Sequence, residues 1–234
     1  MSDHILSAYD TELNELRSIV SRMGGLAGDQ LVGSMQALKE RDAEEAQRLR
    51  DADAELDRLE AKAEQAAIGV FARRAPVADD LREVVSALKM TSLIERMGDY
   101  AKNIAKRTLA ISKNHPVVLP QTIETMAERA HQMIQNVMDA YAHQNAEAAV
   151  EVWESDEILD NLHNAAYRQI LARMMETPEH INIYTHYLMI AKNLERIGDQ
   201  TTNIAEQIYY TNTGNVLEDS RPKGDVTSVG KADE

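Results

Sequence analysis

One acidic, glycine-containing phrase occurs twice in this chain. The sequence ERMGDYAKNIA at Glu95–Ala105 returns as ERIGDQTTNIA at Glu195–Ala205, and seven of the eleven positions are identical. Upstream of the phrase, several methionines, alanines and aspartates of residues 23–57 recur 103 positions later, whereas Pro76 recurs at Pro178. The distance between matching residues is therefore 103 up to residue 57, 102 at the proline and 100 in the phrase. It changes only near the connection that precedes each copy, where insertions are tolerated. This pattern predicts that the chain folds as a duplicated unit.

The prolines and the apolar spacing predict helices. The apolar residues are mainly Ala, Leu, Ile, Val and Met, and aromatic residues make up only 4%, which is a helix-forming composition. The sequence has five prolines, and between them apolar residues recur at helical spacing. We therefore expect six long helices over about residues 3–39, 42–72, 79–113, 122–144, 146–175 and 180–212.

These six helices predict an all-α fold of two tandem three-helix bundles. The first bundle is expected at residues 1–113 and the second at residues 122–212. Between them, residues 114–121 carry two prolines and predict an extended linker. Residues 213–234 are polar and lack helical periodicity, so they are expected to form a disordered tail.

Composition excludes several classes of protein. The chain has 39 acidic and 25 basic residues and a net charge of −14, which argues against nucleic acid as a partner, and no basic face is expected. It has no cysteine, so disulfides, thiolate metal sites and cysteine nucleophiles are excluded. No apolar run approaches the ~18 residues of a membrane span, and the N-terminus lacks a secretory signal pattern. A soluble cytoplasmic protein is expected.

Acidic residues four positions apart form the strongest candidate site. Such a pair projects from one helix face, and like charges at this spacing are destabilising by ~0.2–0.5 kcal/mol. One pair is unremarkable in so acidic a chain, but the second and third helix of each half both carry one. Because these helices are expected to be antiparallel neighbours, four carboxylates would converge in each half at a groove edge open to water, where oxygen ligands suit Mg, Ca, Mn or Fe. The candidate metal ligands are Asp53, Asp57, Glu95, Asp99, Asp156, Asp160, Glu195 and Asp199.

Glycines inside the repeated phrase add a second signal. Gly98 and Gly198 each cost about 1 kcal/mol relative to alanine in a helix interior. Their presence in both halves predicts a close approach of another helix or of a ligand. Asn103 and Asn203 continue the face of the glutamates and are expected to supply a carbonyl oxygen or a hydrogen bond.

Three motifs together resemble the PhoU family of phosphate-signalling regulators. They are RAPVADDLR at Arg74–Arg82, the two ERxGDxxxNIA phrases, and the DxxxD pairs at Asp53/Asp57 and Asp156/Asp160. The resemblance extends over nearly the whole chain, to about Tyr210. It implies a duplicated three-helix-bundle fold whose carboxylate motifs hold iron, manganese, zinc or magnesium ions, including multinuclear clusters.

The same resemblance implies a function. A PhoU-like protein is expected to be a negative regulator of the phosphate-starvation response and of phosphate uptake. It would act as an adaptor, without enzyme activity, between the ATPase subunit of the phosphate ABC transporter and the membrane sensor histidine kinase. A cytoplasmic homodimer, peripherally associated with membrane complexes but not inserted in the membrane, is the corresponding expectation.

Two alternatives remain open from the residues alone. A ferritin-like di-iron enzyme needs two Glu-x-x-His motifs and two further glutamates on four helices. The chain offers one literal match at Glu128–His131 and an approximate one at Asp160–His163, both in one half, and most histidines are expected at the surface. An accessory protein of a different phosphate transporter would keep the fold and metal faces but change the partner. Phosphate-binding glycine loops and a G-x-S-x-G elbow are both missing from the sequence.

Overall fold

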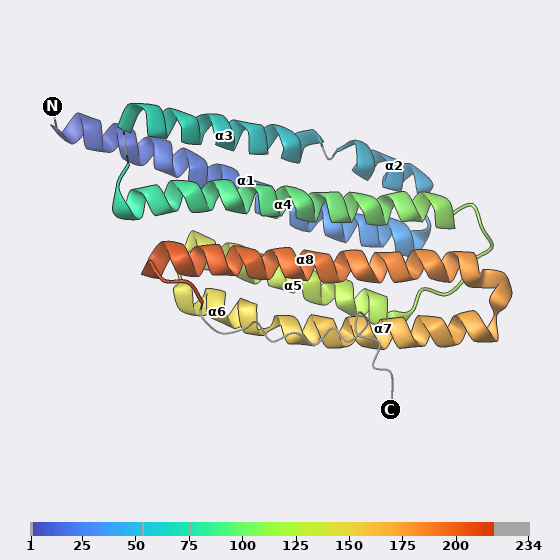
Figure 1. The fold of residues 1–234 in the computed structure, drawn as a ribbon. Coiled ribbons are helices and arrows are strands. Elements are labelled where there is room, and N and C mark those ends of the chain that lie inside the picture. Colours follow the sequence, from blue (N-terminus) through green and yellow to red (C-terminus); the bar gives the residue numbers. More distant parts are fainter. Residues whose placement is uncertain (1, 53, 75, 218–234) are drawn as a thin grey trace.

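The chain folds into helices packed side by side along one long axis (Figure 1). In the computed structural model, residues 2–52, 54–74 and 76–217 are described, and every element in these ranges is a helix. None of the helices in these ranges is long and apolar enough to span a membrane. The elements are α1 (Ser2–Glu40), α2 (Ala43–Asp51), α3 (Ala54–Arg74), α4 (Ala78–Ile111), α5 (Gln121–Ala142), α6 (Ala146–Glu154), α7 (Asp156–Glu176), the short 3₁₀ helix η1 (Pro178–His180) and α8 (Ile181–Thr213).

The predicted all-α, duplicated arrangement is confirmed, with one correction that recurs in both halves. The helices expected over residues 42–72 and 146–175 are each divided in two, near Ala52 and at Ser155. Ser155 keeps helical dihedral angles, φ −73° and ψ −8°, so the apolar period continues across the kink and the sequence pattern does not reveal it. The new helix α7 begins with Asp156 and Glu157, whose charges suit a helix N-terminus.

Other boundaries follow from capping. Asp42 accepts hydrogen bonds from the amides of Glu44 and Glu45 and so begins α2, and Asn145 begins α6 in the same way through the amide of Ala148. At the other end of the chain, Gly214 has φ +74° and ends α8. The predicted tail from residue 213 falls mainly on residues 218–234, which lie outside the described residues.

Each half is a three-helix unit, and the third helices of the two units lie side by side. In Figure 1, α4 and α8 run antiparallel through the centre of the molecule, with α1 and α5 beside them. The pair α2 and α3 covers α1 and α4 on one side, and the pair α6 and α7 covers α5 and α8 on the other. The second and third helices of each unit are therefore antiparallel neighbours, as expected.

A continuous hydrophobic core joins the two units. The apolar residues flanking the repeated glycines are all buried, and they belong to one cluster together with residues of α1, α3, α5 and α7: Ile94, Met97, Ala101 and Ile104 on α4, and Leu194, Ile197 and Ile204 on α8. Helices α1 and α5 also approach closely, because a Cβ atom built on Gly24 would lie 2.4 Å from Sδ of Met138. The apolar faces of both units are thus buried against each other.

The linker between the units is held from both sides. The Arg41 guanidinium donates hydrogen bonds to the carbonyl oxygens of Ile111 and Asn114, at 2.8 and 2.6 Å. The Tyr187 hydroxyl, from α8, donates to the carbonyl of Val117 at 2.9 Å. These contacts fix the course of the chain from α4 to α5.

Because the core is shared, a destabilising substitution in one unit is expected to destabilise the other unit as well. Met97 of the first unit is 1% exposed, and Met97→Ala is expected to lower the free energy of unfolding by about 2–5 kcal/mol. The only tryptophan, Trp153, lies in the second unit and is 6% exposed, so its fluorescence reports that unit alone. In urea titrations of Met97→Ala, we expect the unfolding transitions followed by Trp153 fluorescence and by far-ultraviolet circular dichroism to shift together to lower urea concentration. Unfolding in two steps, with the tryptophan transition unmoved, would contradict a shared core.

Candidate functional site

The predicted carboxylates of the second unit lie on two packed helices. Asp156 and Asp160 project from the first turns of α7, and Glu195 and Asp199 belong to the neighbouring α8. Asp156 is 1% exposed, Asp160 4% and Glu195 5%, whereas Asp199 is half-buried. The expectation of a groove edge open to water is therefore wrong for three of these four residues. The reason is that α7 packs directly over the acidic face of α8.

Gly198 allows this close packing. A Cβ atom at Gly198 would lie 2.4 Å from Cδ2 of Leu159 and 3.2 Å from Oδ1 of Asp156. The close helix approach predicted from the glycine is confirmed in this unit. The contact also places the Asp156 carboxylate against the turn of α8 that carries Glu195 and Asp199.

Other polar side chains are buried at the same interface. Lys192 Nζ donates to Oε1 of Glu195 at 2.7 Å, so one cation already borders the carboxylates. His163 and Asn164 of α7 are only 4% and 5% exposed. Sequence reasoning placed most histidines at the surface and missed the burial of His163. The available signal was its spacing, because a residue three positions after Asp160 lies on the same helix face.

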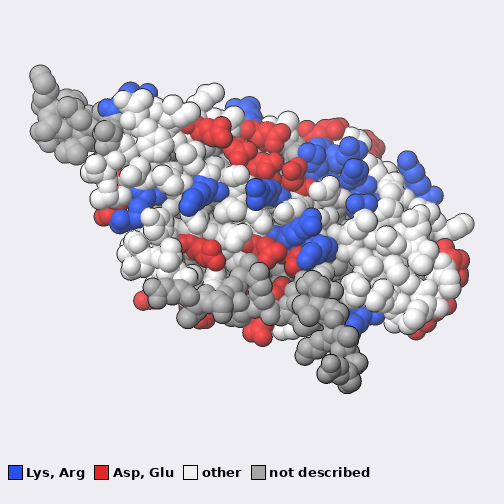
Figure 2. Space-filling model, in the orientation of Figure 1, with Lys and Arg blue, Asp and Glu red and all other residues white. Residues whose placement is uncertain are grey.

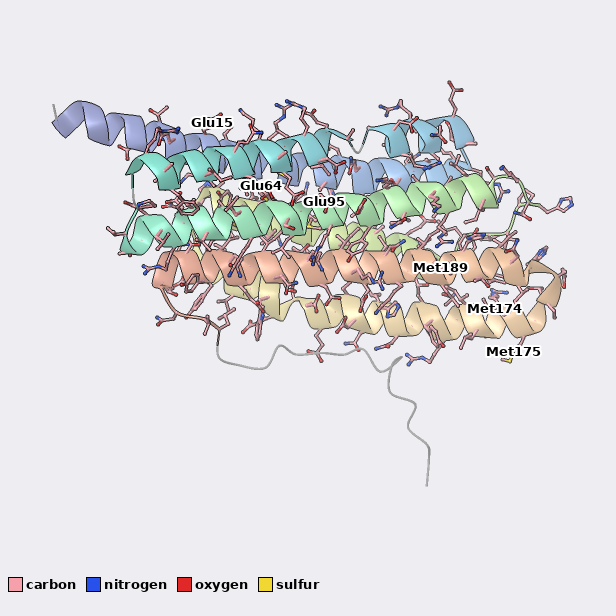
Figure 3. The ribbon with its side chains drawn as sticks, turned by 45° about the horizontal axis from the view of Figure 1, so that its top comes forward. Glu15, Glu64, Glu95, Met174, Met175 and Met189 are labelled. Carbon is pink, nitrogen blue, oxygen red and sulfur yellow. The ribbon has the colours of Figure 1, made fainter. Side chains whose placement is uncertain are left out.

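The first unit is more open to water in its described part. Glu95 and Asp99 of α4 are half-buried, and Asp57 of α3 is exposed. Oδ1 of Asp99 accepts from Lys102 Nζ at 3.3 Å, and the Asp99 side chain is 47% exposed. Figure 3 shows Glu95 on α4 together with further glutamates of α3 and α1, so acidic side chains gather on this side of the molecule.

Of the four predicted carboxylates of the first unit, Asp53 lies outside the described residues. Within the described ranges, no three His, Asp or Glu side chains are grouped so as to hold a metal ion. The repeated asparagines also differ, because Asn103 is exposed and Asn203 half-buried.

Substitution of the repeated glycine tests the packing that builds this site. Gly198→Ala is expected to destabilise the protein by about 1–3 kcal/mol, because the new methyl group must displace Leu159. The matched control is Gly25→Ala, a helical glycine with no atom within 4 Å of the added Cβ, which is expected to stabilise by up to about 1 kcal/mol. Urea unfolding measures both. Two shifts of the same sign and size would contradict a close approach of α7 and α8.

Comparison with known proteins identifies the family. The PhoU domain model matches twice, at residues 20–108 and 123–208, and so detects both units. The phosphate-specific transport system accessory protein PhoU homolog of Caulobacter vibrioides is 42% identical over 229 residues, covering 97% of this chain and 100% of that protein. The homolog of Rhizobium meliloti is also 42% identical, with coverage of 97% and 96%.

Solved structures give the same result. The crystal structure of PhoU from Pseudomonas aeruginosa matches with a TM-score of 0.85 and 30% identity, covering 88% of this chain and all of that one. The phosphate transport system regulatory protein PhoU from Streptococcus pneumoniae matches with a TM-score of 0.84 and 28% identity, covering 90% and 99%. Two matched domains, full-length relatives and a shared fold agree, and this chain belongs to the PhoU family.

Proposed function

We propose that this chain is a negative regulator of the phosphate-starvation response and of phosphate uptake. It acts as an adaptor between the ATPase subunit of the phosphate ABC transporter and the membrane sensor histidine kinase, and not as an enzyme. The observation that carries the proposal is likeness over the full length to proteins named as accessory to phosphate-specific transport. The similar solved structure from Streptococcus pneumoniae is likewise of a phosphate transport system regulatory protein.

The proposal places the protein in the cytoplasm, peripherally bound to membrane complexes, as a homodimer. The surface of the protein consists of long helices, and partner proteins can bind along the faces of such helices. Apolar side chains left exposed near the junction of α7 and α8 offer a surface for self-association: Leu171, Met175 and Ile181. Figure 3 shows Met175, with Met174, at this end of the molecule.

Metal binding by the carboxylates is part of the proposal. The support is the chemistry of the donors in the second unit: Asp156, Asp160 and Glu195 are carboxylates buried on facing helices, and Gly198 keeps the Asp156 carboxylate close to α8, although the described side chains are not grouped as a metal site. Ionised carboxylates are costly to bury unless a positive charge compensates them. A bound iron, manganese, zinc or magnesium ion would add to the positive charge that Lys192 already places beside Glu195. Asp199 would complete the set there, and Asp53, Asp57, Glu95 and Asp99 would form its counterpart in the first unit.

A phosphatase reporter of the starvation response tests the regulatory proposal. In phosphate-rich medium, deletion of the gene is expected to raise reporter output, and the parent gene is expected to restore repression. Unchanged output in the deletion strain would contradict the regulator and favour an accessory role on another transporter.

The same strain tests the acidic faces. A variant with Glu95, Asp99, Glu195 and Asp199 replaced by Ala is expected to fail in repression. Its control removes four exposed carboxylates elsewhere, Asp29, Asp139, Glu147 and Glu179, and so changes the net charge equally. Both variants are compared at equal abundance by immunoblot. Equal repression by the two variants would remove the acidic faces from the mechanism.

Elemental analysis tests metal binding directly. Protein purified without chelator is expected to contain bound metal, and the nearly isosteric variant Asp156→Asn/Asp160→Asn is expected to contain less, because amides do not supply the negative charge. The control Asp29→Asn/Asp139→Asn should keep the parental content. Ligand binding to the native state also raises the melting temperature, so readded metal should stabilise the parent more than the first variant. Identical metal content in all three proteins would refute the proposal.

A further inference from the structure

A row of basic side chains runs along the seam between α4 and α8. Figure 2 shows Lys and Arg atoms following this seam, with Asp and Glu atoms on both sides. We call the row the basic stripe, and its residues are Arg82, Lys89, Arg96 and Arg107 of α4 with Lys192 and Arg196 of α8. This differs from the expectation that a chain of net charge −14 has no basic face.

Helical spacing explains the part of the stripe on α4. Arg82, Lys89 and Arg96 follow one another at intervals of seven residues, and Arg107 comes eleven residues later. Both intervals are close to whole numbers of helical turns, so these side chains share one face of α4. Glu95 lies on a different face of the same helix, on the side of Glu64 of α3 (Figure 3).

Helix α8 also contributes residues to the stripe, because it packs antiparallel beside α4. Cζ of Arg196 lies 5.7 Å from the centre of the Tyr100 ring, which brings α8 into contact with the middle of α4. At one end of the seam, Cζ of Arg82 lies 3.4 Å from the Cβ position of Gly214. The seam therefore extends at least from Arg82 to Tyr100, and the four stripe residues of α4 span about 37 Å at a helical rise of about 1.5 Å per residue.

Several charges of the stripe are available to a partner. Within the described residues, Arg82 pairs with Asp79 and Lys192 with Glu195, but no carboxylate forms an ion pair with Lys89, Arg96 or Arg107. Lys89 and Arg96 are exposed. The three cations without an ion pair in the described part of the chain, Lys89, Arg96 and Arg107, create a locally positive field in a strongly acidic protein, and such a field attracts anionic groups.

The acidic side chains beside the stripe favour a partner that is no wider than the seam. Acidic side chains border it on both sides (Figure 2). Glu95 lies on the side of α3 (Figure 3), and Glu206 lies on the side of α6, where its Oε1 accepts a hydrogen bond from Trp153 Nε1 at 3.1 Å. A flat anionic membrane or a nucleic acid duplex would place phosphates against these carboxylates as well as against the stripe. A single helix lying along the seam would meet the stripe alone.

Apolar side chains between the cations also favour a single helix as the partner. Leu93 and Tyr100 of α4 are partly buried on the stripe's face, and Met189 of α8 is 42% exposed near the Arg107 end. An amphipathic helix can contact such residues with its apolar positions while its acidic positions meet Lys and Arg.

We propose that the seam between α4 and α8 is the docking site of an acidic amphipathic helix of a partner protein. The carboxylates of that helix pair with the basic stripe, and its apolar side chains rest on Leu93, Tyr100 and Met189. That this helix belongs to a phosphate-regulation partner rests on the proposed function, whereas the docking surface itself rests on the geometry.

Binding of a synthetic peptide tests the proposal. The probe is a fluorescent helical peptide of about 25 residues, long enough to span the stripe, with Glu along one face and Leu beside it. A second peptide has Gln in place of every Glu. The parent protein is expected to bind only the Glu peptide, and more weakly as salt is raised. Lys89→Glu/Arg96→Glu is expected to weaken binding at least tenfold.

The matched control separates the stripe from net charge. Lys113→Glu/Arg168→Glu makes the same charge change at two exposed positions off the stripe, and it is expected to bind like the parent. Circular dichroism melting checks that both variants fold. Equal losses in the two variants, or no loss in the first, would overturn the docking site.

Two further measurements test whether a membrane or a second copy of the chain binds at the seam instead. Stripe-dependent binding to phosphatidylglycerol vesicles, with no binding of the Glu peptide, would overturn a protein partner in favour of a membrane. Self-association of the parent that Lys89→Glu/Arg96→Glu abolishes, again without peptide binding, would assign the seam to a second copy. Peptide binding at the stripe, together with an unchanged reporter in the deletion strain, would support the docking site and contradict only the proposed regulator.

Discussion

The antiparallel packing of α4 against α8 organises the rest of this molecule. Each helix carries one copy of the repeated phrase, and the apolar residues of both copies point into one core. Because the two helices run in opposite directions, their acidic faces turn away from each other, one toward α3 and the other toward α7. The surface between them is the seam that carries the basic stripe (Figure 2). Duplication followed by face-to-face packing therefore produces both charged features at once.

The two units nevertheless differ at the acidic faces. In the second unit α7 approaches α8 closely enough to bury Asp156, Asp160 and Glu195. In the first, Asp57 is exposed and Asp99 is about half exposed and paired with Lys102. Burial increases the cost of a carboxylate's charge, so the second face depends more strongly on neighbouring cations than the described part of the first.

Much of the fold follows from the sequence, because its signals are local. Proline positions and apolar spacing predict the order of the helices, and Gly198 predicts a close helix contact. The kink at Ser155 escapes prediction because the residue keeps helical angles and the apolar period is unbroken. The candidate ligands are visible as spaced pairs, but the burial of Glu195 depends on how closely another helix packs over it. The basic stripe combines residues about a hundred positions apart, and the net charge of −14 conceals it.

Hydrogen exchange followed by mass spectrometry tests most directly whether the α4 and α8 pair holds the two units together. Regions that open only with global unfolding exchange most slowly. If this pair holds the units together, the central amides of α4 and α8 exchange most slowly in the protein and share one opening free energy, while those of α2 and α6 exchange faster. Substitution of Met97 by Ala should lower protection in both central helices equally. Loss of protection in α4 with α8 unaffected would instead show that the two units unfold independently and that the α4 and α8 pair does not join them.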